Sequence, residues 1–277
     1  MVNCTHMYLG IDIGGTKTLI GRFTRDGELQ ESLKFPTPKS YAEFQQSLAE
    51  GIARITTKPW KLACVAAPGT VNHEKGIVEA FGNLKWTKTP LVATVRSIAG
   101  CDVLIDNDAK LAALSEARAL KTDYHKVLYV TISTGIGAGL VIDGKLDRDL
   151  SDSEVGWMLH EREGKMVTWE SFASGKAIVK RFHKQAEDIN DPHVWKLVSH
   201  DIALGLIDVC AVLQPDIVIL GGGVGGHYPK FKKPLNDELK KYESPLVRAP
   251  KIVAAKRPHE AVLLGCYQMM KDHLKRK

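Results

Sequence analysis

The sequence predicts an α/β protein made of two similar halves, and three observations support this fold class. An apolar run typical of a buried strand ends in a polar, glycine-rich turn near residue 8, and the pattern recurs near residue 127. Other segments carry apolar residues at helical spacing. The length of 277 residues suits about two domains. We therefore expect a duplicated α/β fold of two lobes with a cleft between them.

The first half is expected to open with a meander of three antiparallel strands. Arg25-Asp26-Gly27-Glu28 is a strong turn signal between two apolar runs. Ser40, with Glu43 three residues later, is typical of a helix start. The predicted elements are strands at 8–13, 19–23, 29–35, 61–67 and 103–105 and helices at 40–55 and 109–120.

The second half repeats the order of strand, glycine turn, strand and later helices. Its predicted elements are strands at 126–133, 140–142 and 217–220 and helices at 175–186, 194–213 and 260–271. We assign residues 1–108 to a small N-terminal lobe, which a C-terminal helix at 260–277 completes. Residues 109–259 form the larger C-terminal lobe in this assignment.

The composition is that of a globular protein and excludes several other classes. Hydrophobic residues make up 44% and charged residues 25%, which excludes a disordered chain, a collagen and a small disulfide scaffold. The net charge of +6 is spread out and suits a solvated surface or an anionic substrate better than a nucleic-acid stripe. The five cysteines form no C-x-x-C pair. No signal peptide or membrane span is evident, so we expect a cytoplasmic protein.

Three glycine-rich loops each follow a predicted strand. They are Gly14-Gly15-Thr16, Thr134-Gly135-Ile136-Gly137-Ala138-Gly139 and Gly221-Gly222-Gly223. Glycine lets backbone N–H groups approach a ligand closely, and phosphate oxygens accept hydrogen bonds from such groups. Neither the G-x-x-x-x-G-K-[ST] motif of P-loop NTPases nor the dinucleotide-binding G-x-G-x-x-G motif is present. The loops therefore favour a nucleotide site of another kind.

Asp12 and Asp108 each stand at the end of a predicted strand, where ligands approach open α/β sheets. A carboxylate there can hold Mg²⁺ through water or accept a proton from a substrate hydroxyl. For a lone aspartate the simpler interpretation is a turn cap. Asn107 beside Asp108 adds an amide with donors and an acceptor, and the pair suits a polyhydroxylated ligand.

An acidic segment with two tryptophans runs from Asp152 to Glu170. Its simplest interpretation is a solvated lid loop. A zinc site would need His or Cys ligands at short spacing, and only His160 lies close in sequence.

Taken together, these motifs resemble the ROK group of sugar kinases and repressors, which has the actin-like ATPase (ribonuclease H-like) fold of hexokinases. The resemblance spans about residues 8 to 270 and rests on five ordered motifs. They are Asp12–Lys17 (first phosphate motif), Gly82–Trp86 (N-L-x-W), Asp106–Ala109 (N-D-A), Ser133–Gly139 (second phosphate motif) and Gly221–Gly223 (adenosine-side loop). Repressor members carry an N-terminal helix-turn-helix domain, which we do not expect here because the first motif begins near residue 11.

The resemblance implies a role for each matching residue. Asp108 would be the general base that takes the proton from the sugar hydroxyl, and Asp12 would help to place Mg²⁺, through water. The sugar would be held by Asn83, Asn107, Glu154 and Glu170, with Trp157 in the wall of the pocket. The nucleotide would be held by Gly14, Gly15, Thr16, Lys17, Thr134, Gly135, Gly137, Gly221, Gly222 and Gly223.

Two departures from the family pattern concern zinc. The histidine of the family's E-x-G-H motif, which binds zinc in many members, is Trp157 here, and the accompanying cysteine cluster is absent. We therefore expect no structural zinc. Trp157 would either stack on a sugar face or remove a hydroxyl contact. Glu161-Arg162-Glu163-Gly164 resembles a stretch in the family's polyphosphate-using glucokinases, which makes polyphosphate an alternative donor.

The sequence thus predicts a sugar kinase that transfers the terminal phosphoryl group of ATP, with Mg²⁺, to a hexose hydroxyl. The 6-hydroxyl of glucose is the leading candidate. The alternatives are a polyphosphate-using glucokinase, a kinase for an N-acetylated sugar, and a non-catalytic sugar sensor that kept the fold. A nucleic-acid-binding regulator is disfavoured, because we expect no nucleic-acid-binding domain. We expect a sugar as partner, neither nucleic acid nor membrane, and a homodimer as in many family members.

Overall fold

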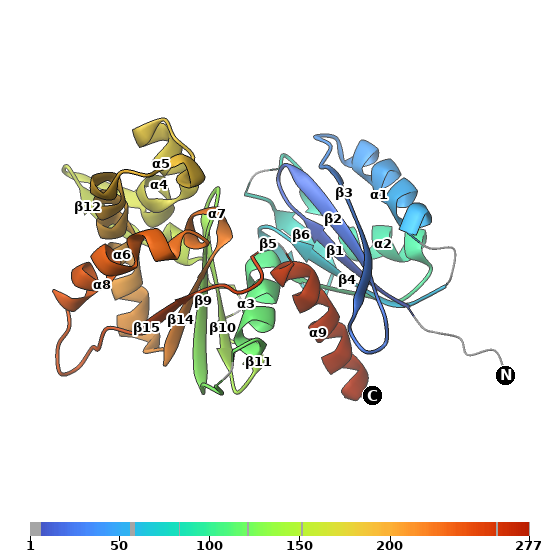
Figure 1. Cartoon of the computed structure of the whole chain (residues 1–277). Coiled ribbons are helices and arrows are strands. Elements are labelled where there is room, and N and C mark those ends of the chain that lie inside the picture. Colours follow the sequence, from blue (N-terminus) through green and yellow to red (C-terminus); the bar gives the residue numbers. More distant parts are fainter. Residues whose placement is uncertain are drawn as a thin grey trace. The chain divides into compact units, whose positions relative to one another are not determined.

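The computed structural model describes residues 7–55, 59–82, 84–120, 122–150, 152–258 and 260–276 (Figure 1). The strands are β1 (Met7–Ile13), β2 (Lys17–Phe23), β3 (Leu29–Pro36), β4 (Trp60–Ala67), β5 (Thr70–Asn72), β6 (Ile77–Ala80), β7 (Thr87–Thr89), β8 (Val103–Asn107), β9 (Lys126–Ile132), β10 (Ile136–Ile142), β11 (Lys145–Leu146), β12 (Leu159–Arg162), β13 (Lys165–Thr168), β14 (Ile217–Gly221) and β15 (Lys251–Ala254).

The helices are α1 (Tyr41–Ile55), α2 (Leu91–Ala99), α3 (Asp108–Arg118), α4 (Trp169–Ala173), α5 (Gly175–Phe182), α6 (Pro192–Leu213), α7 (Gly222–Gly225), α8 (Tyr228–Lys240) and α9 (Ala261–Lys275). Two short 3₁₀ turns, η1 (Val155–Trp157) and η2 (Ala186–Asp188), complete the described elements.

The chain divides into two compact units. Unit 1 consists of Met1–Ser115 and His259–Lys277, and unit 2 consists of Glu116–Pro258. The helix at the C-terminal end, α9, therefore belongs to the unit that the N-terminal strands build.

The two units contain five-stranded sheets with the same strand order. Unit 1 has the order β3-β2-β1-β4-β8, and unit 2 has β11-β10-β9-β14-β15. In each sheet the first three strands are antiparallel neighbours, and two later strands run parallel to the first. The duplication predicted from the repeated glycine turns is thus present as repeated sheet topology.

Helices cover both faces of the unit 1 sheet. Successive side chains of a strand point to opposite faces, so Ile11 of β1 packs with Phe44 of α1 while Tyr8 packs with Leu263 of α9. Figure 1 shows α9 in red across the sheet from α1 and α2. Because both faces are buried, the sequence of β1 is almost continuously apolar.

Helix α9 also lies directly against α3. A Cβ atom at Gly265 would overlap the backbone carbonyl oxygen of Leu111, so only glycine allows this approach. The contact sits within an apolar cluster that contains Leu111, Leu263 and Cys266. Helix α9 is therefore an internal part of unit 1.

The core of unit 2 forms between its sheet and α4, α6 and α8. Val130 and Ile132 of β9 pack in one cluster with Trp169 of α4, Leu206 of α6 and Phe231 of α8. Trp169 is fully buried, and its indole Nε1 donates a hydrogen bond to the backbone oxygen of Asp201 at 3.1 Å. The indole nitrogen is therefore satisfied inside the core.

Three segments differ from the sequence-based expectation. Strand β10 begins at Ile136, so most of the predicted loop at 134–139 is strand, because Ile136 and Ala138 are buried against the core. Helix α5 ends at Phe182 and not at 186, because His183 adopts a left-handed conformation with φ of 55°. The predicted lid loop at 152–170 instead forms η1, the β12–β13 hairpin and the start of α4.

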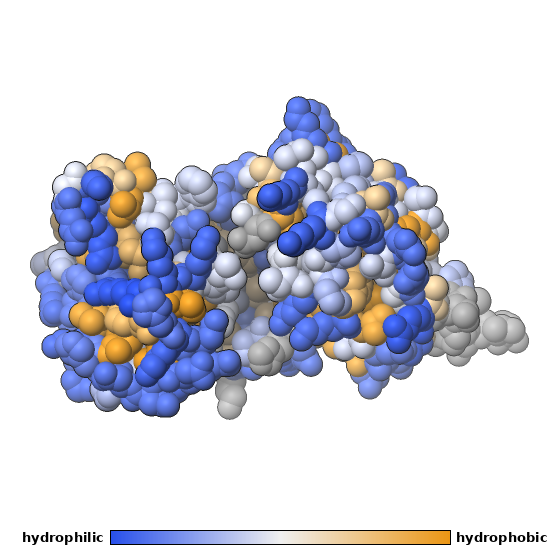
Figure 2. All heavy atoms as spheres, turned by 90° about the horizontal axis from the view of Figure 1, so that it is seen from above, coloured by the Kyte–Doolittle hydropathy of each residue, from blue (hydrophilic) through white to orange (hydrophobic). Residues whose placement is uncertain are grey.

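In the part of the chain that the structure describes, no helix has both the length and the apolar character needed to cross a membrane. Figure 2 shows one face of the molecule on which hydrophilic side chains predominate and hydrophobic side chains gather in small groups. Scattered apolar residues of this kind are ordinary on protein surfaces.

Candidate active site

The carboxylates Asp12 and Asp108 lie at one edge of the unit 1 sheet. Asp12 of β1 is in register with Ala66 of β4, and Ala66 is in register with Asp106 of β8. Asp108 follows two residues later as the first residue of α3. Because β1, β4 and β8 are parallel, their carboxyl ends meet at the same edge, as the sequence predicted for a ligand site.

Both carboxyl groups have raised pKa values. Burial, the negative charge of Asp108 and, in opposition, the cation of Lys17 together bring the pKa of Asp12 to about 7. Burial also raises the pKa of Asp108, against the hydrogen bond from the Ala109 N–H and the charge of Lys110. A carboxyl group whose ionisation is disfavoured by burial and by a neighbouring carboxylate is a candidate site for a proton or a cation.

Asn107 has a structural task that the sequence did not predict. Its Oδ1 accepts a hydrogen bond from the Ala109 N–H at 2.9 Å, and its Nδ2 donates to the Gly69 carbonyl at 3.1 Å. Asn107 thus caps the first turn of α3, in the way that asparagine commonly does. The cap fixes the backbone between β8 and α3, where Asp108 lies.

The first glycine turn, Gly14 to Thr16, connects β1 to β2. The Gly14 N–H donates to the Lys17 carbonyl at 2.9 Å, and a Cβ atom at Gly14 would lie 2.8 Å from that oxygen. Thr37 binds the turn from behind, because its hydroxyl donates to the Gly14 carbonyl at 2.8 Å and its N–H donates to the Thr16 carbonyl. Thr16 and the side chain of Lys17 are exposed.

The buried hydroxyl of Thr18 completes this arrangement. It lies 2.9 Å from the Thr37 hydroxyl. Since the single proton of Thr37 is donated to Gly14, Thr18 must donate to Thr37. The chain of two hydroxyls holds the turn in a fixed shape.

The second glycine turn, at Ser133 to Gly135, connects β9 to β10 in unit 2. Glu170 lies against it, because its Oε2 accepts from the Ile136 N–H at 3.3 Å and a Cβ atom at Gly135 would lie 2.7 Å from that oxygen. The structure therefore brings Gly135 and Glu170 together. Gly137, predicted to bind the nucleotide, lies inside β10 and pairs with Thr131.

The third glycine segment connects β14 to the short helix α7. Gly222 has a φ of 76°, and a Cβ atom there would lie 2.5 Å from the Ile132 carbonyl oxygen. Gly221 is buried against Tyr129. Gly223 is exposed, and a Cβ atom there would meet no atom within 4 Å. Only Gly223 of the three lines the neighbouring cavity.

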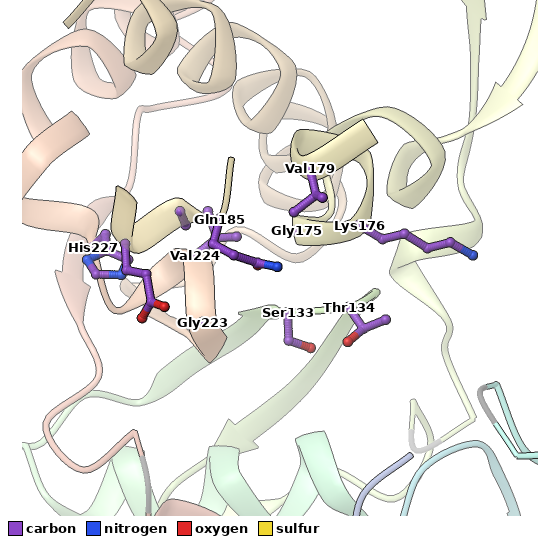
Figure 3. A pocket seen from close by; sticks show the side chains of 11 residues that line it. Ser133, Thr134, Gly175, Lys176, Val179, Gln185, Gly223, Val224 and His227 are labelled. Atoms are coloured by element: carbon purple, nitrogen blue, oxygen red, sulfur yellow. The ribbon is translucent and has the colours of Figure 1, made fainter. Parts of the chain in front are cut away.

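That cavity, of about 500 Å³, lies within unit 2 (Figure 3). Ser133, Thr134 and Lys176 lie toward one end, and Gln185 and His227 lie toward the other. The first turn of α5 faces the cavity through Gly175 and Lys176, and Lys176 supplies a cation to the lining, whereas the Gly175 N–H donates to the Ser133 carbonyl at 2.7 Å. The apolar side chains that line it are Val179, Ala186 and Val224.

Of the residues that line this cavity, only Thr134 and Gly223 belonged to the sequence-based site. Lys176, Gln185 and His227 come from segments that only the tertiary fold brings together. The one signal in the sequence was the position of Lys176 in the Ser174-Gly175-Lys176 stretch at a helix start.

The remaining predicted site residues lie in unit 2, except one. Glu154 is exposed just before η1, and the side chain of Trp157 is 65% exposed. Asn83 lies outside the described residues. The joint role of Trp157 and Glu170 in holding the sugar stays a prediction.

The β12–β13 hairpin occupies the segment where the family resemblance would have located a zinc motif. Arg162 of β12 and Arg181 of α5 both bind the buried carboxylate of Asp201 in α6, at 2.8 and 2.7 Å. Burial raises the pKa of Asp201, and the two guanidinium groups oppose the rise. Among the described residues, no group of three or more His, Cys, Asp or Glu side chains is arranged to hold a metal.

Comparison with known proteins gives a consistent result. The model of the ROK family matches residues 8–273. A fructokinase-like protein from Bacillus subtilis (strain 168) is 31% identical over 236 residues, which is 78% of this chain and 76% of that protein. An N-acetyl-D-glucosamine kinase from Escherichia coli is 28% identical over 290 residues, or 90% and 94% of the two chains.

Solved structures share the fold. A ROK family glucokinase from Streptomyces griseus, in complex with glucose and AMPPNP, has a TM-score of 0.80 at 23% identity, over 95% of this chain and 98% of that chain. An inorganic polyphosphate/ATP-glucomannokinase from Arthrobacter sp. strain KM has a TM-score of 0.75 at 26% identity, over 97% and 99%. The predicted actin-like ATPase architecture is thereby confirmed.

Proposed function

The chain belongs to the ROK family, and from that premise we propose that it is a sugar kinase. It transfers the terminal phosphoryl group of ATP, with Mg²⁺, to a hexose hydroxyl, and the 6-hydroxyl of glucose is the first acceptor to test. Relatives that are named for glucose and N-acetyl-D-glucosamine support the class of acceptor.

The observation that carries the proposal is Asp108, a carboxylate with a raised pKa at the carboxyl end of β8. An ordinary carboxylate is a weak base, and burial brings its pKa closer to the working pH. In the proposed step the sugar oxygen attacks the terminal phosphorus, its proton passes to Asp108, and ADP leaves with the electrons of the broken P–O bond. The caps on Ala109 hold the base in place.

Backbone N–H groups of the glycine turns would stabilise the transferred phosphoryl group. Such preorganised donors are the main source of rate in phosphoryl transfer. In unit 2 the candidates are the N–H groups of the turn at Thr134 and Gly135, and Lys176 would add a positive charge beside them. In unit 1 the candidate is the Gly14 to Thr16 turn, which Thr37 holds in shape.

The residues of unit 1 fit a magnesium ion. Mg²⁺ is commonly bound through one or two carboxylates, with waters and substrate phosphates as its other ligands, so a cluster of three protein ligands is not required. The negative charge of Asp108 raises the pKa of Asp12, and a cation bound nearby would oppose this rise. Asp12 would hold the ion through water, and the ion would offset negative charge on the phosphates.

Two side chains of unit 2 would define the sugar. Glu170 is anchored on the second glycine turn and would accept from sugar hydroxyls. The exposed ring of Trp157 offers an apolar surface for the C–H face of a pyranose. The polyphosphate/ATP-glucomannokinase likeness makes polyphosphate the second donor to test.

The test is a phosphotransfer assay on the purified protein with Mg²⁺. The acceptors are glucose, fructose, mannose, N-acetylglucosamine and N-acetylmannosamine, and the donors are ATP and polyphosphate. We expect ADP-forming turnover with at least one hexose that the Asp108→Asn variant loses. Sugar binding by a folded protein that turns over none of these pairs would overturn the kinase and leave the sugar-sensor alternative.

A further inference from the structure

Unit 2 contains a second cavity, of about 530 Å³, which the proposed reaction does not use. It lies on the other side of α5 from the cavity of Figure 3. Gly175, Lys176 and Val179 of α5 face the first cavity, and Ala177, Lys180 and Arg181 face the second. These two sets lie on opposite faces of a helix with 3.6 residues per turn.

Four cations line this second cavity, which we call the basic pocket. Arg162 and Lys165 are cross-strand partners in the β12–β13 hairpin, and Lys180 and Arg181 belong to α5. Glu163 is the one carboxylate in the lining, and the carboxylate of Asp201 pairs with the lining residue Arg162. Four positive charges and two negative ones give the site a net charge of about +2. This charge favours the binding of an anion.

The two guanidinium groups are held in place before any ligand arrives. Asp201, 4% exposed, takes one Nη1 group from each arginine, at 2.8 and 2.7 Å. Arg162 also stacks on the ring of Phe172, with 4.3 Å from its Cζ atom to the ring centroid. A guanidinium has five N–H donors, so each arginine keeps donors for a further acceptor.

The two lysines complete the pocket with unneutralised charge. The ammonium groups of Lys165 and Lys180 take part in no ion pair with any described residue. Their charges are therefore available to a ligand. The side chains of Phe172 and Val167 add an apolar wall to the same cavity.

We propose that the basic pocket binds a phosphoryl-bearing anion, at a site separate from the nucleotide cavity. Fixed arginines match the planar oxygen pairs of phosphate groups, and lysines add unselective positive charge. The cavity volume is within the range of small-molecule sites. The apolar wall suits a short carbon skeleton, as in a sugar phosphate, and the row of cations suits a polyphosphate chain.

The experiment measures anion binding by isothermal titration calorimetry at low salt. The probes are inorganic phosphate, glucose 6-phosphate and tripolyphosphate. The test variant is Lys165→Gln/Lys180→Gln, which removes two unpaired charges and leaves the Asp201 pairs intact. The control is Lys145→Gln/Lys196→Gln, which removes two charges from exposed lysines of the same unit. Lys176→Gln shows whether a probe binds in the cavity of Figure 3, the proposed nucleotide site.

We expect the test variant to bind at least one probe tenfold or more weakly than wild type. The control should stay within about threefold of wild type for that probe, and Lys176→Gln should weaken its binding less than the test variant does. Stronger binding of glucose 6-phosphate than of tripolyphosphate would assign the pocket to a sugar phosphate, and the reverse order would assign it to a chain. Binding that survives in the test variant and is lost in Lys176→Gln would overturn the proposal, as would no binding of any probe at 10 mM, about the weakest affinity that such a site should have.

Discussion

The two units have one sheet topology and carry different residues at the corresponding strand ends. In unit 1 the penultimate residue of the first strand is Asp12, and Asp108 follows the last strand. In unit 2 the penultimate residue of the corresponding strand is Thr131, and the last strand ends at Ala254. Unit 2 instead gathers Lys176 at one cavity and four further cations at another.

This difference shows how a duplicated fold can divide a task. The repeated strand–turn–strand pattern supplies two glycine turns, and the residues around each turn then set its charge. Carboxylates suit a metal ion and a proton acceptor, whereas lysines and helix N–H groups suit phosphates.

The largest effect is expected at Asp108. Asp108→Asn should lower the rate of phosphotransfer by about 10²–10⁴-fold, because the amide cannot accept the sugar proton. Asp102→Asn is the matched control, because Asp102 is exposed at the opposite end of β8. Steady-state kinetics on both variants, with melting temperatures to verify folding, measure the effect. An equal loss in both variants would contradict the role of Asp108.

The next effect concerns the backbone of unit 2. Gly222→Ala should destabilise the protein by on the order of 3 kcal/mol, because Gly222 has a positive φ and its Cβ would approach the Ile132 carbonyl. Gly223→Ala next to it meets no atom within 4 Å and should change stability by about 0.5 kcal/mol or less. Urea unfolding of the pair measures the difference. Similar values for the two variants would mean that the turn is not fixed in this shape.

Asp12 should give a pH-dependent effect on stability in unit 1. Its pKa rises from 3.8 to about 7 on folding, so between these values the folded protein holds a proton that the unfolded chain releases. Stability from this group is therefore lost as the pH rises through that window, and the loss is complete above pH 7. Asp12→Asn removes the penalty and should stabilise the metal-free protein by on the order of 2 kcal/mol at pH 8, and by less at pH 5.

Thermal unfolding in the presence of a chelator, at both pH values, measures the effect of Asp12→Asn. Asp102→Asn again serves as control, since its carboxyl group is exposed. A variant that is destabilised at pH 8 would show that the Asp12 carboxylate makes favourable contacts that outweigh its burial.

The smallest effect is expected at Thr37. Thr37→Val removes the hydroxyl that donates to Gly14 and leaves the buried Thr18 hydroxyl without its acceptor. The cost should be about 1–2 kcal/mol of stability, together with a raised KM for ATP. Thr37→Ser keeps the hydroxyl and should restore the KM. If Thr37→Ser behaves like Thr37→Val, the methyl group and not the hydroxyl matters at this position.

Much of the framework could be predicted because local signals were strong. The apolar runs before Gly14 and Ser133 predicted β1 and β9, and the Asp26-Gly27 turn predicted the β2–β3 hairpin. Helix α8 was not predicted, since its lysines and the internal Pro234 hide the buried positions Phe231 and Leu235. Burial in that helix depends on α6, which no local pattern reveals.

The residues of the candidate site could be predicted only where they lie together in one segment of the sequence. The glycine turns and Asp108 are contiguous motifs, so their positions followed from the sequence. The cavity of Figure 3 joins a strand turn, a helix start and a later loop, so Gln185 and His227 could not be inferred. The hydrogen bond from Asn107 to the Gly69 carbonyl could not be inferred either, because the two residues are 38 positions apart in the sequence.

The tight crossing of α9 and α3 at Gly265 has a consequence for how the protein is made. A ribosome delivers the chain from its N-terminus, so all of unit 2 is synthesised before α9 exists. The cluster of Leu111, Leu263 and Cys266 cannot form until then. Unit 1, which begins first and carries both aspartates, is therefore finished last. A nascent chain would thus contain every residue of the unit 2 core before the core of unit 1 is complete.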